Sequence, residues 1–414
     1  MSESRPPTTP EVIPLKRSLS LPLITLYGLG TTIGAGIYVL VGEVAAEAGM
    51  FAPVSFAVAS VIASLTAMTF AELSSRHPKS AGEAIYVNEG LGLPGVAVVV
   101  GGLVVFTGLV SAAAMANGFV GYFNELIALP RRPSIILVVG VLGVTAAIGI
   151  SQSVTIAALI TVVEVGGLIF VVWVARDQFG EASHLSAMLP PLEAAPWGGI
   201  MAGSVLAFFA FIGFEDMVNV AEEVKGVRRT LPLAIMLTLG ITTVLYALVT
   251  VVAVAALPLE ALSGAEAPLA LLYTQATGAA PTVISLIAIV AVLNGALIQV
   301  IMASRVLYGL SNEGWLPSVV GTVHPVTRTP LVATALASGV VLLLALALPL
   351  ITLALTTSLT VLVVYGLVNL ALWRIKRRDP EPEGVVTVPL WVPITGFVVN
   401  VAFIGFQVVH GLGD

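Results

Sequence analysis

The sequence has no cysteine, four histidines and few charged residues. Asp, Glu, Lys and Arg together make up 10% of the 414 positions. Without cysteine the chain has neither disulfides nor thiolate metal sites. His77, His184, His324 and His410 are isolated, and neither an HExxH spacing nor GxSxG in a strand–helix context occurs. These absences argue against an enzyme, and we expect no metal site, no cofactor and no nucleic-acid partner.

Apolar residues dominate the composition. They make up 58% of the chain, and the mean hydropathy is +1.06. A helix needs about 20 apolar residues to cross the ~30 Å hydrocarbon core, and such runs recur along almost the whole chain. The composition therefore excludes a soluble fold and predicts an all-α, multi-pass membrane protein with the lipid bilayer as its partner.

Apolar runs between breaker residues mark the expected membrane spans. The sequence predicts eleven helices, at about 19–42, 52–74, 94–123, 133–150, 153–175, 198–222, 231–256, 281–310, 331–349, 351–373 and 389–411. The polar, Pro-rich residues 1–18 lack the apolar core of a signal peptide, and we expect them to form a disordered cytoplasmic tail.

The distribution of Lys and Arg predicts the orientation. With a cytoplasmic N-terminus, Arg131, Arg132 and Arg176 fall outside, which leaves fourteen of the seventeen basic residues inside. Inside loops carry the excess of basic residues in multi-pass proteins. We therefore expect the N-terminus to lie in the cytoplasm.

Two of the expected spans are poor helices. The first contains Gly28, Gly30, Gly34 and Gly36, and each Gly in a helix interior costs about 1 kcal/mol relative to Ala. The sixth is apolar only as far as Phe214, before two acids interrupt it. We expect both spans to be broken into half-helices.

The two weak spans are five apart, as an inverted repeat of five helices requires. Irregular backbone is tolerated at membrane depth where it lines a cavity, and paired broken helices are typical of secondary transporters with a midplane site. Free N–H groups of the first break would bind a carboxylate, and free carbonyls of the sixth span would bind an ammonium. A zwitterionic amino acid carries both groups. The expected parts are residues 19–175, residues 198–373 and an accessory C-terminal helix, 389–411.

Simpler interpretations exist for each feature. Gly28, Thr32 and Gly36 are spaced by four, which is also the pattern of a small-residue packing face between helices. Glu215 and Asp216 are placed where they would cap the second half-helix of span six.

At these residues the chain resembles the amino acid–polyamine–organocation transporters, in particular their cationic amino acid transporter-like branch. The resemblance covers about residues 19–375 and is carried by TTIGAGIYVLVG (31–42), AELSSRHPKSAGEAIYV (71–87), FFAFIGFEDMVNVAEEVKGVRRTLPLAI (208–235) and SRVLYGLSNEGWLPSVVGTVHPVTRTP (304–330). It implies a LeuT-like fold with two inverted five-helix repeats and broken helices 1 and 6. Family members usually have twelve or fourteen helices, so a twelfth span is the alternative to our eleven.

The resemblance also implies a substrate site. The substrate carboxylate would bind the backbone N–H groups of Gly34, Ala35 and Gly36. The amino group would bind main-chain carbonyls near Thr32, Ile33, Phe209 and Ile212. The ring of Phe209 would cover the substrate, or would be an ordinary apolar contact. Asn294 in span eight would reach the substrate side chain, or would form an interhelical hydrogen bond, as would Gln299 and Asn117.

Glu164 is the departure from the family that bears most on mechanism. It stands near the centre of span five, where many prokaryotic relatives carry a Lys thought to couple transport to protons. An ionised acid at this depth costs about 2.5–3.5 kcal/mol, so Glu164 must face protein or water. Three roles stay open: carrying a proton, helping to hold Na⁺, or forming a structural hydrogen bond. We expect H⁺ rather than Na⁺ as the coupling ion.

The remaining acids lie near the expected cytoplasmic ends. Glu72, Glu222 and Glu223 stand close in sequence to Arg76 and Arg228. Interfacial ion pairs are the simplest interpretation, and the resemblance adds an inner gate that would include them. Glu215 aligns with an acidic position of the family and belongs with the broken helix.

Together these features predict a proton-coupled amino acid symporter of the plasma membrane that works by alternating access. An exchanger and an Na⁺-coupled symporter are the alternatives within that class. A membrane amino-acid sensor without transport is the alternative outside it. The sequence does not indicate which amino acid is carried, nor the oligomeric state.

Overall fold

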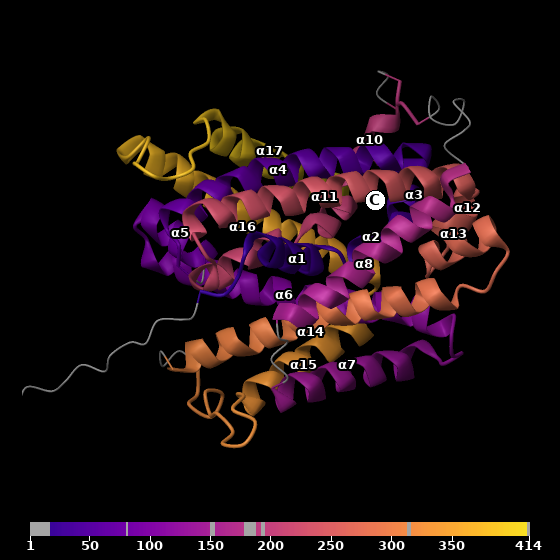
Figure 1. Ribbon diagram of the computed structural model, residues 1–414, viewed down its shortest axis with the longest axis horizontal. Helices are drawn as coiled ribbons and strands as arrows, with labels where there is room; N and C mark the ends of the chain where they lie inside the picture. The colour runs from indigo at the N-terminus through magenta and orange to yellow at the C-terminus, as the bar shows by residue number, and fades with distance from the viewer. Residues whose placement is uncertain are drawn as a thin grey trace, which may run out of the picture.

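A computed structural model describes residues 17–79, 82–149, 154–177, 188–191, 195–312 and 316–411. In these ranges the chain forms helices that run along the long axis of the molecule (Figure 1). An isolated bridge between Leu19 and Val224 is the β-type pairing within them. The described part of the chain is therefore all-α, as the composition predicts.

The helices follow one another along the chain. Their bounds are α1 Leu21–Thr32, α2 Ala35–Tyr38, α3 Val41–Ala48, η1 Gly49–Phe51, α4 Ala52–Arg76, α5 Gly82–Leu91, α6 Pro94–Asn124, α7 Arg131–Ile148, α8 Val154–Val174, α10 Ala195–Phe208, η3 Phe209–Phe211, η4 Phe214–Glu223, α11 Val227–Ala256, α12 Leu259–Ser263, α13 Pro268–Thr277, α14 Thr282–Asn312, α15 Leu331–Ala347, α16 Leu350–Arg378 and α17 Trp391–Gly411.

Nine helical segments of the described residues are long and apolar enough to cross a membrane. The expected first span is divided among α1, α2 and α3, and the expected ninth is the shorter helix α15, of 17 residues. The chain is thus a multi-pass membrane protein, and the count of eleven spans stays a prediction. Three short helices between the expected spans, α5, α12 and α13, were not foreseen, because each is too short to give a span-length apolar run.

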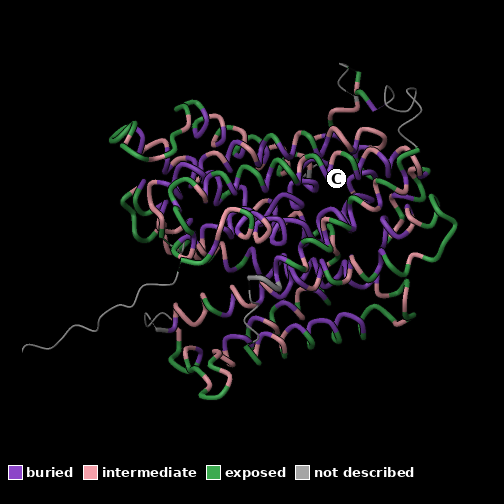
Figure 2. The backbone as a smooth tube through the Cα atoms, in the orientation of Figure 1, coloured by how far each residue is buried: buried purple, intermediate pink, exposed green. Residues whose placement is uncertain are grey.

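Helices five spans apart pack against each other. The contacts pair α1 with η4, α4 with α11, α6 with α14 and α7 with α15. A two-fold relation between two halves of the bundle produces such pairs, and the inverted repeat itself stays a prediction. The buried backbone runs through the centre of the bundle, including α1 and the segment from α10 to η4, while exposed residues lie toward the periphery (Figure 2).

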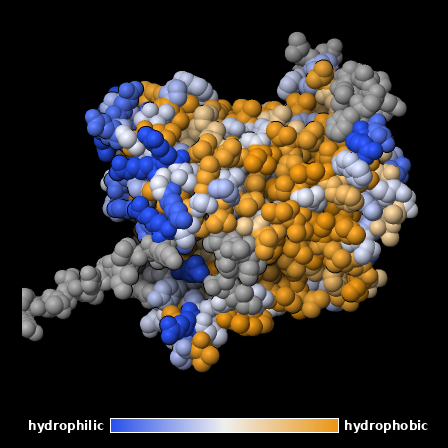
Figure 3. Space-filling view, in the orientation of Figure 1, coloured by the Kyte–Doolittle hydropathy of each residue, from blue (hydrophilic) through white to orange (hydrophobic). Residues whose placement is uncertain are grey.

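The surface is divided into an apolar and a polar part. Figure 3 shows apolar side chains over most of the visible face, with hydrophilic ones gathered mainly at the end where α5 lies and in a smaller group at the opposite end. Exposed Val, Leu and Ile side chains line the outer helices, as lipid contact requires.

The last residues of the expected disordered tail, 1–18, are ordered in the structure. Residues 1–16 lie outside the described residues. Ser18 donates its backbone N–H to the carbonyl of Glu223 at 2.9 Å, and Lys225 donates to Leu19 O at 2.9 Å. The chain entering α1 is therefore held against the end of η4, because its backbone groups pair there.

Candidate functional site

The first break lies between α1 and α2. Helix α1 ends at Thr32, Ile33 is extended (φ −81°, ψ 110°), and Gly34 precedes the short helix α2. The hydroxyls of Thr31 and Thr32 both lie within hydrogen-bonding distance of the carbonyl oxygen of Gly28, at 3.0 and 2.8 Å. Hydroxyls bonded to the preceding turn compete with the helical ladder, and with the neighbouring glycines they favour the end of the helix here.

The second break lies between α10 and η4. After Phe208 the backbone tightens into η3, then Ile212 is extended (φ −70°, ψ 138°). Gly213 has φ +124°, and a Cβ on it would lie 2.3 Å from the carbonyl oxygen of Thr31. Both its conformation and its proximity to α1 therefore require glycine.

The two breaks are joined by hydrogen bonds. Thr31 Oγ1 also lies 2.8 Å from the carbonyl oxygen of Gly213, and its single O–H donates either there or to Gly28. The hydroxyl of Tyr246, on α11, lies 3.1 Å from the carbonyl oxygen of Thr32 and 3.0 Å from that of Ala210. A Cβ on Gly36 would lie 2.2 Å from Ala210 Cα, so the half-helices approach backbone to backbone. The irregular backbone of both spans thus meets in one buried place.

The residues expected to bind the carboxylate and the amino group of the substrate lie at this meeting point. Ile33 and Gly34 form the first break, and Ile212 lies in the second. The whole set is buried: Thr32, Ile33, Gly34, Ala35, Gly36, Phe209 and Ile212. Phe209 is the first residue of η3, at the second break. Asn294 comes from α14 and lies 3.6 Å from the position of a Cβ on Gly30, in the turn of α1 that precedes the break.

A small cavity adjoins the second break. Its volume is about 20 Å³, which is room for a water molecule but not for an amino acid. It is lined by Glu83, Val104, Thr107, Ser111, Ile212, Glu215, Asp216, Gln299, Met302, Val361, Val364 and Tyr365. The packing at the second break is therefore closed to an amino acid.

Glu164 is buried beside the first break. Its backbone carbonyl accepts a hydrogen bond from Tyr38 at 2.8 Å, and its Oε1 accepts one from Asn294 Nδ2 at 3.2 Å. Its Oε2 and Asn294 Oδ1 have no hydrogen-bond partner. Thr161, one turn earlier on α8, lies against Gly30 of α1, because a Cβ on Gly30 would be 2.2 Å from Thr161 Oγ1. Glu164 therefore faces protein, as expected of an acid at this depth.

Acidic side chains also gather around the small cavity at the second break. Glu215 Oε2 accepts the backbone N–H of Gly213 at 2.7 Å, so this side chain caps the turn. Gln299 donates to Asp216 Oδ2 at 3.2 Å. Glu83, on the short helix α5, lines the same cavity. Burial, and to a smaller extent the nearby Glu215, raises the pKa of Glu83 to about 8.

Glu72 forms a buried ion-pair network at one end of the bundle. It binds Arg76 at 2.6 Å and Lys376 of α16 at 3.0 Å, and it accepts the N–H of Val388 at 2.7 Å. The network ties α4, α16 and the segment before α17 together. Arg228 contributes its carbonyl, which accepts the hydroxyl of Ser75 at 2.7 Å. Of the other gate candidates, Glu223 pairs through its carbonyl with Ser18, and Glu222 lies beside it in η4.

The other polar candidates are engaged with neighbouring helices. Asn117 donates to Ala345 O of α15 at 3.2 Å and accepts a hydrogen bond from Arg131. Gln299 is held by Asp216, in the wall of the cavity. Of these two residues, only Gln299 therefore lines the cavity at the second break.

Sequence reasoning missed Tyr246, Glu83 and Lys376. Tyr246 is a hydroxyl-bearing residue inside the apolar run 231–256, a signal that would have raised it as a candidate. Glu83 belongs to the stretch 71–87 that carries the family resemblance, but it falls in the loop between the expected spans 52–74 and 94–123. Lys376 is one cation in the run RIKRR, and the sequence does not tell which of these side chains is buried.

Comparison with known proteins identifies the family. The sequence model of the amino acid permease family matches residues 19–412. The chain is 32% identical, over 77% of its length and 56% of the relative's, to the vacuolar cationic amino acid transporter 4 of Arabidopsis thaliana. It is 27% identical to the branched-chain amino acid permease of Bacillus subtilis, over 89% of this chain and 82% of the relative. It is also 27% identical to the methylthioribose transporter of Bacillus subtilis, over 93% of this chain and 86% of the relative.

The chain therefore belongs to the amino acid permease family of the amino acid–polyamine–organocation superfamily, a family of transporters rather than enzymes. It spans little more than half the length of the plant transporter. The three relatives carry names with different substrates, so membership defines the class of protein and not its substrate.

Proposed function

We propose that this chain is a secondary active transporter that carries amino acids across the cell membrane by alternating access, coupled to protons. The observation that supports it most is the meeting of two broken helices at one buried place in a member of a permease family. Unwound backbone at membrane depth supplies free N–H and carbonyl groups without any side-chain charge.

The proposed substrate contacts are main-chain groups. Helix α2 begins at Ala35 with no side-chain cap, and the first N–H groups of a helix have no partner within it. In our proposal the N–H groups of Gly34, Ala35 and Gly36 bind the substrate carboxylate. The carbonyls of Thr32, Ile33, Phe209 and Ile212 bind its ammonium.

Tyr246 supports the assignment of one of these carbonyls, that of Thr32, and adds the neighbouring carbonyl of Ala210. A phenol has one O–H, so its hydroxyl donates to only one of the carbonyls of Thr32 and Ala210 at a time. An ammonium has three donors and satisfies both. The closed packing is thus short of donors at the point where the substrate ammonium is proposed to bind.

The proposed coupling residue is Glu164. Its Oε2 and Asn294 Oδ1 are buried acceptors without a donor, and such atoms cost about 1–3 kcal/mol each. A proton on Glu164 converts one acceptor into a donor and removes its negative charge from membrane depth. We therefore propose that Glu164 takes up a proton together with the substrate and releases it on the other side. Na⁺ bound by the same oxygens is the alternative that the experiment separates.

Uptake into liposomes tests the function. The purified protein is reconstituted, and uptake of labelled arginine, leucine and methylthioribose is measured with an inward proton gradient and, separately, an inward Na⁺ gradient. Proton-driven accumulation of an amino acid is the expected result. Accumulation driven only by Na⁺ overturns the coupling ion, and movement only into preloaded vesicles makes the protein an exchanger. Binding without either movement makes it a sensor, and uptake of methylthioribose alone overturns the substrate class.

A further inference from the structure

The last turns of α16 present two basic faces with different surroundings. Lys376 is buried and pairs with Glu72 at 3.0 Å. Arg377 and Arg378 are exposed, and Arg374 is half-buried. One helix end thus carries an inward cation with a carboxylate partner and three outward cations on another face.

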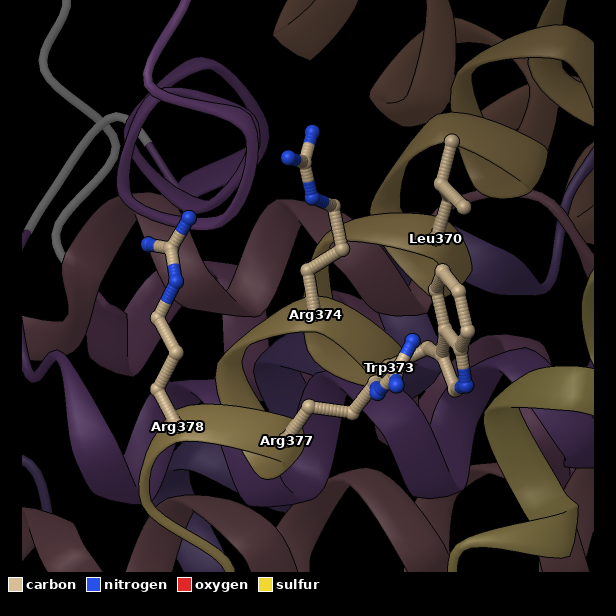
Figure 4. Close-up of a pocket in the computed structure, with 5 residues that line it drawn as sticks. All are labelled: Leu370, Trp373, Arg374, Arg377 and Arg378. Carbon is tan, nitrogen blue, oxygen red and sulfur yellow. The ribbon is translucent and has the colours of Figure 1, made fainter.

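The outward face forms an open pocket. Its volume is about 440 Å³, and it is lined by Leu370, Trp373, Arg374, Arg377 and Arg378. Residues at this spacing lie on one side of a helix. Figure 4 shows Arg374 and Arg378 extended on the same side, with Arg377 beside Trp373. The guanidinium carbon of Arg377 lies 5.2 Å from the centre of the Trp373 ring, a cation–π distance.

No carboxylate of the described residues neutralises these three arginines. Within that part of the chain, the side chains of Arg374, Arg377 and Arg378 form no ion pair or hydrogen bond with an acidic side chain. Asp379, next in sequence, faces Arg76 at 3.5 Å instead. The pocket therefore carries three positive charges that no acid in the described part of the chain pairs with.

The pocket lies at one end of a membrane-crossing helix, the level at which lipid headgroups are expected. Helix α16 is one of the apolar segments long enough to cross a membrane, and the arginines occupy its end. Trp is enriched at the boundary between hydrocarbon and water, and Arg binds phosphate through a planar pair of N–H donors. Leu370 and Trp373 form the apolar side of the same pocket, toward the middle of the helix.

We infer that this face, the α16 arginine pocket, binds the headgroup of an anionic phospholipid. Arg374 and Arg378 hold the phosphate, Arg377 adds charge from its place on Trp373, and Leu370 and Trp373 contact the start of the acyl chains. A free phosphate ion would use the arginines alone and leave the apolar side empty. The pocket's combination of charge and apolar surface fits a lipid better.

Native mass spectrometry of the full chain in detergent tests this inference. Phosphatidylglycerol and phosphatidylcholine are titrated separately, and inorganic phosphate is added as a competitor. We expect phosphatidylglycerol to be retained about tenfold more strongly than phosphatidylcholine, because basic residues at the membrane surface attract anionic lipids. Equal retention of the two lipids overturns the inference without any variant, and full displacement by phosphate makes the pocket a small-anion site instead.

Matched variants locate the site. Arg374→Gln/Arg377→Gln/Arg378→Gln removes the pocket charges. Arg132→Gln/Arg176→Gln/Arg328→Gln removes three exposed charges from separate places. Loss of the phosphatidylglycerol preference in the first variant alone supports the pocket. Equal loss in both variants, or retention in both, overturns it.

Discussion

Asn294 donates its side-chain amide to one carboxyl oxygen of Glu164, at 3.2 Å between Nδ2 and Oε1, while the second carboxyl oxygen has no partner. The pair joins α14 to α8 beside the turn of α1 that precedes the first break. Buried polar groups are normally hydrogen-bonded, and a proton on Glu164 would give this carboxyl a donor in place of an unsatisfied acceptor. The unsatisfied oxygen is the reason to place coupling here.

Replacing Glu164 by Gln should separate transport from its driving force. The amide keeps the size of the side chain but cannot exchange a proton, so the proton and substrate are no longer linked. We expect the accumulation ratio under an inward proton gradient to fall to about one, while exchange into preloaded vesicles continues. The exposed acid Glu260 provides the control, and Glu260→Gln should accumulate substrate normally. Unchanged gradient dependence in Glu164→Gln contradicts the proposal.

A methyl group on Gly36 should force the two breaks apart. Its carbon would lie 2.2 Å from Ala210 Cα, a backbone atom that cannot rotate away. We expect Gly36→Ala to lose about 1–3 kcal/mol of stability from overpacking and to lose substrate-induced thermal stabilisation. Gly240→Ala, with open space around its Cβ position, is the matched control and should be neutral or slightly stabilised. Normal substrate binding by Gly36→Ala would place the site elsewhere.

Removing the hydroxyl of Tyr246 should weaken the closed state. Tyr246→Phe leaves the carbonyls of Thr32 and Ala210 without their shared donor, at a cost of about 1–3 kcal/mol. The melting temperature of the substrate-free protein is the readout. Tyr273→Phe is the control, because the Tyr273 hydroxyl forms no hydrogen bond within the described part of the chain. Equal melting temperatures for wild type and Tyr246→Phe would show that the hydroxyl does not hold the breaks together.

Glu83 should make stability depend on pH. Its pKa is raised by burial from the ordinary 4.5 to about 8, so between these values the folded chain keeps a proton that the unfolded chain has lost. Raising the pH through this range therefore favours unfolding, by up to about 1.4 kcal/mol per pH unit. The stability is fully present below the ordinary pKa and is lost as the pH rises through about 8.

The measurement for Glu83 is the melting temperature in detergent between about pH 5 and about pH 8. Glu83→Gln should fall less steeply with pH than wild type, whereas Glu260→Gln should follow wild type. A slope in Glu83→Gln as steep as that of wild type means that Glu83 does not titrate in this range.

The sequence predicted the class of fold and the places where helices break, because the residues that cause each break lie in the same segment. The glycines of span one and the acids after Phe214 act on their own segments, and the structure has breaks at Ile33–Gly34 and Phe209–Gly213. Glu164 in an apolar run was likewise detectable from its neighbours alone. Short-range properties of this kind can be derived from residue type and spacing.

The contacts between segments could not be derived in the same way. Tyr246 bridges carbonyls that are 214 and 36 residues away in sequence. Glu72 and Lys376 are separated by 304 residues. Within RIKRR, only the rotation of α16 about its axis decides that Lys376 points inward and the arginines outward. Long-range pairing of this kind depends on how helices dock, which hydropathy does not encode.

The most direct test of the central claim is a thermal-shift measurement with matched analogues. The claim is that the two breaks bind the carboxylate and the ammonium of an amino acid together. The purified protein is heated with the amino acid that it transports, with the corresponding amine that lacks the carboxylate, and with the corresponding acid that lacks the amino group. A ligand present at 100 times its Kd stabilises by about 2.7 kcal/mol. We predict this stabilisation for the intact amino acid and not for either analogue, whereas equal stabilisation by the amine or the acid alone would contradict the account.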